Sequence, residues 1–445
     1  MEIKLYNSLT NKIEPFTPIH AGKVSMYVCG PTVYNDVHVG NMRPVVVFDV
    51  LRRFFEYIGY QVTYVSNYTD VDDKIIHKAL EEGKSEKTIT DHYIKAFEKA
   101  AKEIHSRLPN LTPRVTEYMP QIIHFIDSLI KAGAAYEIDG DVYFRVTSIP
   151  DYGTLSNMKL DDLLVGARIE ENSKKESPLD FTLWKATDVG VAWDSAWSRG
   201  RPGWHTECVV MVNSIFPDKI IDIHGGGFDL KFPHHDNEIA QSEALNHNKL
   251  AHYWLHNGFI NLNNEKMSKS VGNVITAKDA IAKYGGNAIR LLLLGTHYRA
   301  PVNLTDDIIS GNQSELLKME SAYCQLAVAL QLNGQTIDQG KATAIQPFLS
   351  ALAEDLNTAN ALTELFVVIK EANQTLRARP LDSKKAEGLL FTLRDMFSIL
   401  GLDVHYPLLT EEDKKLYSSY LSAKSEKNFV LSDEIRQKLI QRKIL

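Results

Sequence analysis

CGPTVYNDVHVGN, residues 29–41, is the stretch that decides how the first part of the chain folds. The six residues before it, 23–28 (KVSMYV), are rich in β-formers and predict a strand, and residues 42–57 predict a helix. A strand, a glycine-containing loop and a helix form the phosphate-binding corner of a parallel α/β sheet, because amides at a helix start attract anions. The loop also carries one thiol, Cys29, and one imidazole, His38.

Neither side chain is strong evidence by itself. An isolated cysteine is most often a small buried hydrophobe, and an isolated histidine is more often a core residue than a catalyst. A second stretch, KMSKS at 266–270, changes the interpretation. Together with HVGN at 38–41 it resembles the two signatures, KMSKS and HIGH, of class I aminoacyl-tRNA synthetases. The resemblance implies that His38, Lys266 and Lys269 are catalytic and act on the phosphates of ATP.

The length and composition limit the possible classes of protein. A chain of 445 residues exceeds one hydrophobic core, so we expect two to four domains. Its 44% hydrophobic and 24% charged residues are those of an ordinary globular protein. The net charge of -7 excludes binding of nucleic acid through bulk positive charge, so an RNA partner requires local basic patches.

The cysteines and the N-terminus indicate the compartment. Cys29, Cys208 and Cys324 are odd in number and far apart, so they do not form a disulfide framework. The N-terminus lacks a basic segment followed by an apolar run, and apolar stretches such as 291–294 are too short to span a bilayer. We therefore expect a cytoplasmic protein without a membrane segment.

Residues 61–73 predict a second strand that runs into a polar loop, followed by helical sequence over 74–105. The loop holds Asp70, Asp72 and Asp73, which on general grounds favour the start of a helix. From 115 to 200 the pattern breaks up into a helix near 120–132, alternating strands over 135–146 and a polar run. This irregular region has the character of an insertion between two halves of a sheet.

Three motifs follow in close succession. They are GRPGWHTEC at 200–208, HGGGFDL at 224–230 and FPHHDNE at 232–238. With CGPTVY at 29–34, NYTDVDDK at 67–74 and YRAPVN at 298–303, they resemble the cysteinyl-tRNA synthetase family within class I. The likeness is close over roughly the first 310 residues and looser beyond. It implies that the insertion is the connective peptide of the class.

His234 and Glu238 are four residues apart, so on a helix they project from one face, which His235 and Asp236 do not share. With Cys29 and Cys208 they make two thiols, one imidazole and one carboxylate, a set suited to zinc in type and number. A surface His/Glu pair beside two buried thiols is the alternative that spacing leaves open. The family resemblance favours the zinc site.

The resemblance also implies an adenylate pocket and an amino-acid pocket. The ATP and adenylate contacts are Gly30, Thr32, His38, Gly40, Asn41, His224, Gly225, Gly226, Asp229 and Lys269, and the substrate contacts are Cys29, Thr69, Trp204 and Cys208. Without the family resemblance, the three glycines at 225–227 are also compatible with a flexible loop. The KMSKS stretch is likewise compatible with a solvated basic turn. Asn41 departs from the class motif, which has a second histidine there.

Helical sequence begins near 311, where Leu316, Met319, Tyr323, Leu326 and Leu330 form an amphipathic face, and Cys324 is interpreted as core packing. Residues 355–362 (DLNTANAL) resemble the start of the family's helical bundle. Residues 432–439 resemble its anticodon-reading segment, although the chain ends at Leu445, where the family usually continues into a small tail with a tryptophan.

We therefore expect an α/β fold: a Rossmann-type parallel-sheet catalytic domain with an inserted connective domain, followed by an α-helical C-terminal bundle. The expected parts are 1–114 and 201–250 for the two halves of the catalytic domain, 115–200 for the insertion, 251–310 for the KMSKS loop and linking region, 311–400 for a tRNA-binding bundle and 401–445 for a short anticodon-binding region.

The resemblance implies a monomeric ligase that uses ATP with Mg²⁺, L-cysteine, tRNA(Cys) and one Zn²⁺ per chain. Two alternatives stay open. One is a ligase of the same fold that donates cysteine to a small amine, as in mycothiol synthesis; Glu238 argues against it, because that family lacks glutamate at this metal position. The other is a catalytically silent paralogue that binds RNA or zinc, and the intact HVGN and KMSKS motifs argue against it.

Overall fold

The computed structural model describes residues 1–158, 174–263, 265–266, 274–337 and 340–445. The chain forms two compact units, which we describe separately. The α/β unit comprises Glu2–Lys283 and Tyr298–Asn303, and the helical unit comprises Met1, Tyr284–His297 and Leu304–Leu445.

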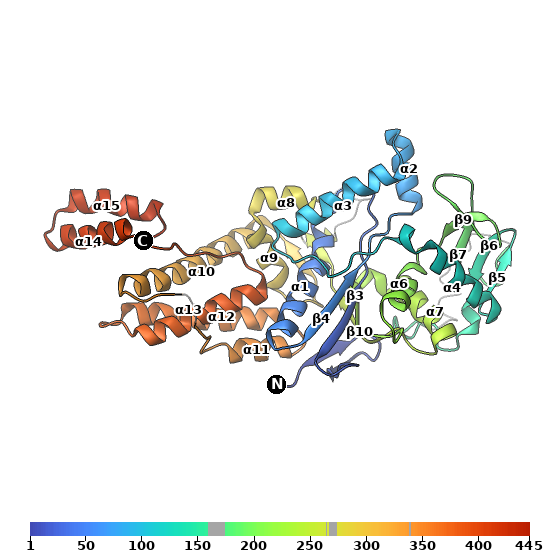
Figure 1. Cartoon of the computed structure of the whole chain (residues 1–445), viewed down its shortest axis with the longest axis horizontal. Helices are drawn as coiled ribbons and strands as arrows, with labels where there is room; N and C mark the ends of the chain where they lie inside the picture. The colour runs from blue at the N-terminus through green and yellow to red at the C-terminus, as the bar shows by residue number, and fades with distance from the viewer. Residues whose placement is uncertain (159–173, 264, 267–273, 338–339) are drawn as a thin grey trace. The chain divides into compact units, whose positions relative to one another are not determined.

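The centre of the α/β unit is a four-stranded parallel sheet (Figure 1). Its strands are β3 (Lys23–Val28), β4 (Gln61–Ser66), β10 (Ile221–Gly227) and β11 (Ala251–Asn257), in the order β11-β10-β3-β4. The chain leaves β3 towards β4 on one side and leaves β10 towards β11 on the other. The strand order therefore reverses between β3 and β10, the position where open α/β sheets bind ligands at the carboxyl ends of their strands.

The predicted fold class is confirmed, and the element at the phosphate-binding corner has the predicted bounds. The strand is β3 and the helix that follows is α1 (Met42–Tyr57). The helical sequence expected over 74–105 is instead two helices, α2 (Asp73–Glu82) and α3 (Glu86–Glu103). Gly83 separates them because it adopts a left-handed conformation with φ of 63°.

The three glycines at 225–227 are not a loop, because β10 continues through all of them. Gly225 sits directly against the ring of Phe48 of α1, and a Cβ at this position would lie 2.1 Å from a ring carbon. A larger residue would push α1 away from the sheet. The flexible loop that the sequence allowed is therefore wrong, and Gly225 serves helix–sheet packing, while its role as a nucleotide contact stays a prediction.

The irregular region contains α4 (Met119–Lys131) and a five-stranded antiparallel sheet in the order β5-β6-β7-β9-β8. The strands are β5 (Ala135–Ile138), β6 (Asp141–Phe144), β7 (Phe181–Ala186), β8 (Trp193–Asp194) and β9 (Arg199–Pro202). Val142, Phe144 and Trp184 are fully buried beneath the sheet. These side chains belong to the same hydrophobic core as residues of the parallel-sheet half such as Val209 and Ile221. The boundaries of the insertion stay a prediction.

The remaining described elements of the α/β unit are short apart from two helices, α6 and α7, that carry site residues. They are β1 (Lys4–Asn7), β2 (Lys12–Pro15), η1 (Val39–Asn41), η2 (Val115–Tyr118), η3 (Val146–Ser148), α6 (Glu207–Ile215), η4 (Phe228–Leu230), the π-helical turn η5 (Lys231–His235), α7 (Asp236–Asn246), β12 (Ile260–Leu262), β13 (Glu265–Lys266), α8 (Ala277–Tyr284) and β14 (Val302–Leu304).

The helical unit contains α9 (Gly286–Leu294), α10 (Asp306–Leu332), α11 (Gln346–Ala353), α12 (Thr358–Arg377), α13 (Ser383–Leu400), α14 (Glu411–Ser425) and α15 (Phe429–Gln441). The amphipathic face predicted on α10 is confirmed, because all five of its residues are buried. Cys324 is not core packing: it is half-buried, and its thiol donates to the carbonyl oxygen of His405 at 3.2 Å. Among the described residues, no helix is long and apolar enough to cross a membrane.

Candidate active site

The four residues predicted to hold a metal meet at the carboxyl ends of β3 and β10. Cys29 follows β3, Cys208 is the second residue of α6, His234 lies in η5 and Glu238 lies in the first turn of α7. The two sulfurs are 3.6 Å apart, and the distance from Cys208 Sγ to His234 Nε2 is 3.8 Å. Glu238 Oε1 lies 2.9 Å from His234 Nε2 and 3.6 Å from Cys29 Sγ. All four ligand atoms lie within 4.8 Å of one another.

These separations fit a tetrahedral zinc ion. With Zn–S bonds of about 2.3 Å, two sulfurs of one tetrahedron lie about 3.7 Å apart, and a sulfur and a nitrogen slightly less. The sulfur–sulfur distance of 3.6 Å and the sulfur–carboxylate distance of 3.6 Å correspond to such edges. Cys208, His234 and Glu238 are buried, and all three cysteines of the chain are free of disulfides. The donor set and its spacing therefore suit zinc.

The protonation of the cluster reflects its burial and its close neighbours. Burial raises the pKa of the Cys29 thiol, and Cys208 and Glu238 raise it further. Burial also favours the neutral Cys208 thiol, but hydrogen bonds from Cys29 and His234 bring its pKa to about 7. Burial opposes protonation of His234, yet Glu238 and Cys208 raise its pKa to about 10. The pKa of Cys29 and of His234 is raised in part by the same two neighbours, Cys208 and Glu238, whose negative charge a divalent cation would balance.

A second imidazole beside Cys29 escaped the sequence analysis. His235 Nε2 lies 3.3 Å from Cys29 Sγ, and its Nδ1 lies 2.8 Å from His256 Nε2. We placed His235 off the metal face because we assumed an α-helix. Residues 231–235 instead form a π-helical turn, with extended backbone at Phe232. His224 completes this side, with Nε2 2.7 Å from Glu238 Oε2 and its ring stacked on Trp254 at 4.4 Å.

Thr69 is buried, and it binds a carboxyl group that the sequence analysis missed. Its hydroxyl donates to Glu207 Oε2 at 2.7 Å and accepts from Asn67 Nδ2 at 3.3 Å. Burial raises the pKa of Glu207. A glutamate directly before a predicted ligand, Cys208, was the available signal. Thr69 thus orients a buried carboxyl next to a ligand sulfur.

The three aspartates after β4 have three different roles. Asp72 caps α2 by accepting from the amide of Lys74 at 2.8 Å, as expected for a helix start. Asp70 instead accepts from the amide and hydroxyl of Thr116. Asp73 forms an ion pair with Arg201. Asp72 and Asp73 therefore lie at the helix start as expected, and Asp70 does not.

Replacing Thr69 by Val should destabilise the α/β unit by about 1–3 kcal/mol, because the Glu207 carboxyl would lose its donor while staying buried. Thr69→Ser keeps the hydroxyl and should cost much less. All five tryptophans lie between residues 184 and 254, so tryptophan fluorescence during urea unfolding reports on this unit. Equal midpoints for the Val and Ser variants would show that the hydroxyl contributes nothing.

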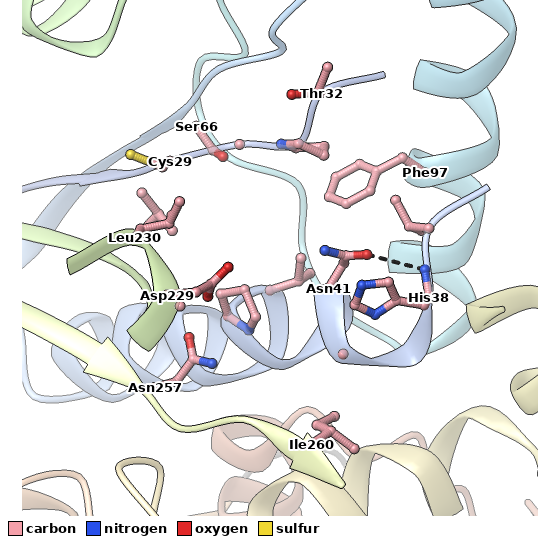
Figure 2. A pocket seen from close by; sticks show the side chains of 18 of the residues that line it. Cys29, Thr32, His38, Asn41, Ser66, Phe97, Asp229, Leu230, Asn257 and Ile260 are labelled. Atoms are coloured by element: carbon pink, nitrogen blue, oxygen red, sulfur yellow. Dashed lines mark hydrogen bonds between the residues drawn. The ribbon is translucent and has the colours of Figure 1, made fainter. Parts of the chain in front are cut away.

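A cavity of about 490 Å³ opens beside the metal cluster, and its walls include Cys29 and Trp204 (Figure 2). Trp204 is 41% exposed and stacks on His234 with 4.3 Å between ring centroids. The other predicted residues on the wall are Gly30, Thr32, His38, Gly40, Asn41 and Asp229. The structure does not bring His224, Gly225 or Gly226 to this wall, where Gly227 takes their place, and two predicted substrate contacts, Thr69 and Cys208, do not line it either.

The HVGN motif forms the far end of the cavity. Figure 2 shows the side-chain oxygen of Asn41 accepting a hydrogen bond from the His38 amide, at 3.2 Å. The amide nitrogen of Gly30 donates to Asn67 Oδ1 at 2.9 Å, and a Cβ on Gly30 would lie 1.6 Å from the Asn67 carbonyl oxygen. Gly30 is therefore required by close approach to the loop after β4.

The segment after KMSKS is tied to the HVGN loop. Ile275 accepts from the amide of Val39 at 3.0 Å, and the amide of Ala277 donates to Val37 at 2.8 Å. Before the motif, Lys266 lies in β13 and its backbone pairs with Asn261 of β12. The side chain of Lys266 and all of Lys269 lie outside the described residues. After the motif, the described chain therefore resumes at residues that are hydrogen-bonded to the HVGN loop.

This architecture defines a class. A parallel sheet whose switch point joins an HVGN loop to a KMSKS segment is that of class I tRNA synthetases, and residues 15–314 match the family described as tRNA synthetases class I (C) catalytic domain. Residues 347–405 match the DALR domain. Among solved structures, Mycobacterium tuberculosis methionyl-tRNA synthetase bound by methionyl-adenylate has a TM-score of 0.62 at 14% identity, covering 92% of this chain and 96% of that one. This likeness shows the fold.

Curated relatives give the specific family. A cysteine--tRNA ligase of Brevibacillus brevis is 45% identical and one of Shouchella clausii is 46% identical, each over 100% of this chain and 97% of the relative. The chain belongs to the cysteine--tRNA ligase family. The family and enzyme class expected from the sequence are confirmed.

Proposed function

We propose that the protein activates L-cysteine with ATP and transfers it to the 3′ end of tRNA(Cys). One observation carries this proposal: Cys29, Cys208, His234 and Glu238 converge at one end of a cavity whose other end is built by HVGN. A metal-lined end suits a thiol substrate, and a loop before a helix suits phosphates. The name of the relatives, cysteine--tRNA ligase, agrees with a thiol substrate.

We assign ATP, accompanied by Mg²⁺, to the HVGN end of the cavity. His38, Lys266 and Lys269 are the proposed catalytic residues, which stabilise negative charge on the leaving pyrophosphate. Gly30, Thr32, Gly40, Asn41 and Asp229 line the cavity and are proposed nucleotide contacts. His224, Gly225 and Gly226 were predicted to share this role, and for them it stays a prediction, because they lie off the cavity wall.

Cysteine is assigned to the other end, between Trp204 and the cluster, with Thr69 behind it. Cys29, Cys208, His234 and Glu238 would hold one zinc ion. When bound there, zinc supplies a soft Lewis acid for which a thiolate is a much better ligand than a hydroxyl. Trp204 covers the cluster from the solvent side, where its ring stacks on His234. The cysteine carboxylate then faces the nucleotide end, where it attacks the α-phosphate and releases pyrophosphate.

Charging of a tRNA(Cys) transcript with labelled cysteine tests the proposal directly. Formation of cysteinyl-tRNA in the presence of ATP is the expected result. A protein that exchanges pyrophosphate with cysteine but charges only a small amine would be the amine-forming ligase. A protein with neither activity would be the silent paralogue. Monomeric state, cytoplasmic location and the six sequence-defined parts stay predictions.

The last helix offers a point at which tRNA binding can be separated from activation. Arg442, which directly follows this helix, is ion-paired with Asp413 at 2.7 Å and with Glu412 at 2.9 Å. Arg436 and Lys438 are exposed, and no ion pair is recorded for either within the described residues. We propose that these two side chains contact tRNA phosphates.

Arg436→Ala with Lys438→Ala should weaken tRNA binding and leave pyrophosphate exchange unchanged. Each lost phosphate contact should lower the steepness of the salt dependence of tRNA binding by about one unit of log K per log salt. The measurement is the KM for tRNA at several salt concentrations, with cysteine-dependent exchange as the internal control. An unaltered salt slope would remove this helix from the proposed tRNA surface.

A further inference from the structure

A buried polar atom on the cavity wall lacks a partner. Asn257, the last residue of β11, is 3% exposed and lines the cavity. Its Nδ2 donates to the carbonyl oxygen of Gly258 at 3.1 Å, which fixes the orientation of the carboxamide. Its Oδ1 has no hydrogen-bond donor within the described part of the chain. Leaving such an acceptor unsatisfied is costly, so the cavity calls for a donor here.

A second acceptor stands beside it. Asn257 pairs in register with Gly227 of β10, two residues before Asp229. The Asp229 carboxylate folds back over Gly227, where a Cβ would lie 2.5 Å from its Oδ1. Figure 2 shows the Asn257 side-chain oxygen directed towards Asp229. Two acceptors therefore face one region of the cavity, and no donor between them is recorded for the described residues.

We infer that Asn257 binds the ribose of ATP, with its Oδ1 accepting a hydrogen bond from one hydroxyl of the cis-diol while Asp229 accepts from the other. This inference rests on the proposed function, because it assumes that the cavity holds ATP. Two adjacent hydroxyls supply the two donors that the paired acceptors require. A carboxylate accepting from ribose hydroxyls is the arrangement used at the nucleotide-binding corner of other parallel α/β sheets.

The adenine amino group is the other part of ATP that can donate two hydrogen bonds. Asp229 is exposed, which allows a solvated carboxylate beside hydroxyls, whereas a base amino group is normally read within a closed, neutral pocket. The position also agrees: Asn257 ends β11 and Asp229 follows the end of β10, and both line the cavity whose other wall carries the HVGN loop. The ribose is therefore the better assignment.

The test combines full-length variants with nucleotide analogues. Cysteine-dependent pyrophosphate exchange is measured with ATP, 2′-deoxy-ATP, 3′-deoxy-ATP and purine riboside triphosphate, which lacks the amino group. Asn257→Leu should raise the KM for ATP by about 3- to 10-fold, the range of one hydrogen bond. In this variant the KM for one deoxy analogue should equal the KM for ATP. The KM for purine riboside triphosphate should exceed that for ATP by the same factor as in the unmodified enzyme. Asn257→Ala should behave alike and serves if the Leu variant fails to fold.

Ile260→Ala is the matched control, because Ile260 lines the same cavity without a polar group. It should shift the KM of all four nucleotides by the same factor. If Asn257→Leu also shifts all four equally, the residue only shapes the cavity and the inference is overturned. If Asn257→Leu instead removes the difference in KM between purine riboside triphosphate and ATP, Asn257 contacts the base and the inference is likewise overturned. Absence of exchange in the unmodified enzyme would contradict the proposed function, a distinct outcome.

Discussion

Replacing Glu238 by Ala should remove the preference of the enzyme for cysteine over serine. Glu238 is fully buried, and its Oε1 lies 2.9 Å from His234 Nε2 and 3.6 Å from Cys29 Sγ. Loss of this carboxylate takes one of four proposed metal ligands from the cluster. Cysteine and serine are near-isosteres, and a pocket that reads size alone separates such pairs by only about 10²-fold. Most of the discrimination must therefore come from the chemistry of sulfur.

Under the proposed mechanism, no separate editing site is needed. A thiol near a divalent cation deprotonates and becomes a strong soft ligand, whereas the serine hydroxyl is a far poorer donor. Four protein ligands usually make a closed structural site. The cluster here lies beside an open cavity, with Cys29 and Trp204 on its wall, so a substrate sulfur has access. Selection at the binding step is then sufficient.

The measurement is zinc content together with pyrophosphate exchange for both amino acids. Glu238→Ala should contain much less than one zinc per chain, and cysteine activation should fall steeply while the weak serine activity changes little. Glu243→Ala is the matched control, because Glu243 lies on the same helix but pairs with Lys249 at 2.7 Å. A metal-free enzyme that still prefers cysteine by about 10⁴-fold, as in specific polar readout, would refute the mechanism.

The sequence predicted those features that follow from local pattern. The bounds of β3 and α1 were correct because a β-rich run, a Gly/Pro loop and an apolar helix repeat carry strong local signals. His234 and Glu238 were paired correctly by their spacing, although His234 lies in η5 and not in α7. The pairing holds although the assumed single α-helix does not, because His234 lies just before the start of α7 and Glu238 lies in its first turn.

The features that were missed depend on contacts across the fold. His235 reaches Cys29 only because Lys231–His235 is a π-helical turn, which no periodicity predicts. Glu207 becomes a functional candidate only once Thr69 is known to lie 2.7 Å away. Asn257 is noticed only as a buried oxygen without a donor within the described residues. Each required distances between residues that are remote in sequence.

Replacing Lys269 by Ala should slow cysteine activation by about 10²- to 10³-fold, with little change in the affinity for cysteine. The ammonium group is most valuable as negative charge builds on the leaving pyrophosphate, and contacts made only in the transition state appear in kcat. Lys269 lies outside the described residues. The segment that follows the motif is described, and in it Ile275 and Ala277 are hydrogen-bonded to the HVGN loop.

Lys278→Ala is the matched control for this substitution, because Lys278 is an exposed lysine in α8, just beyond the anchored segment. Its removal should leave both kcat and the KM for ATP unchanged in cysteine-dependent pyrophosphate exchange. Lys269→Arg keeps the positive charge but spreads it over a planar group, so it should recover only part of the rate that Lys269→Ala loses. An unchanged exchange rate in Lys269→Ala would exclude a role for this ammonium in pyrophosphate departure and leave His38 as the only described candidate.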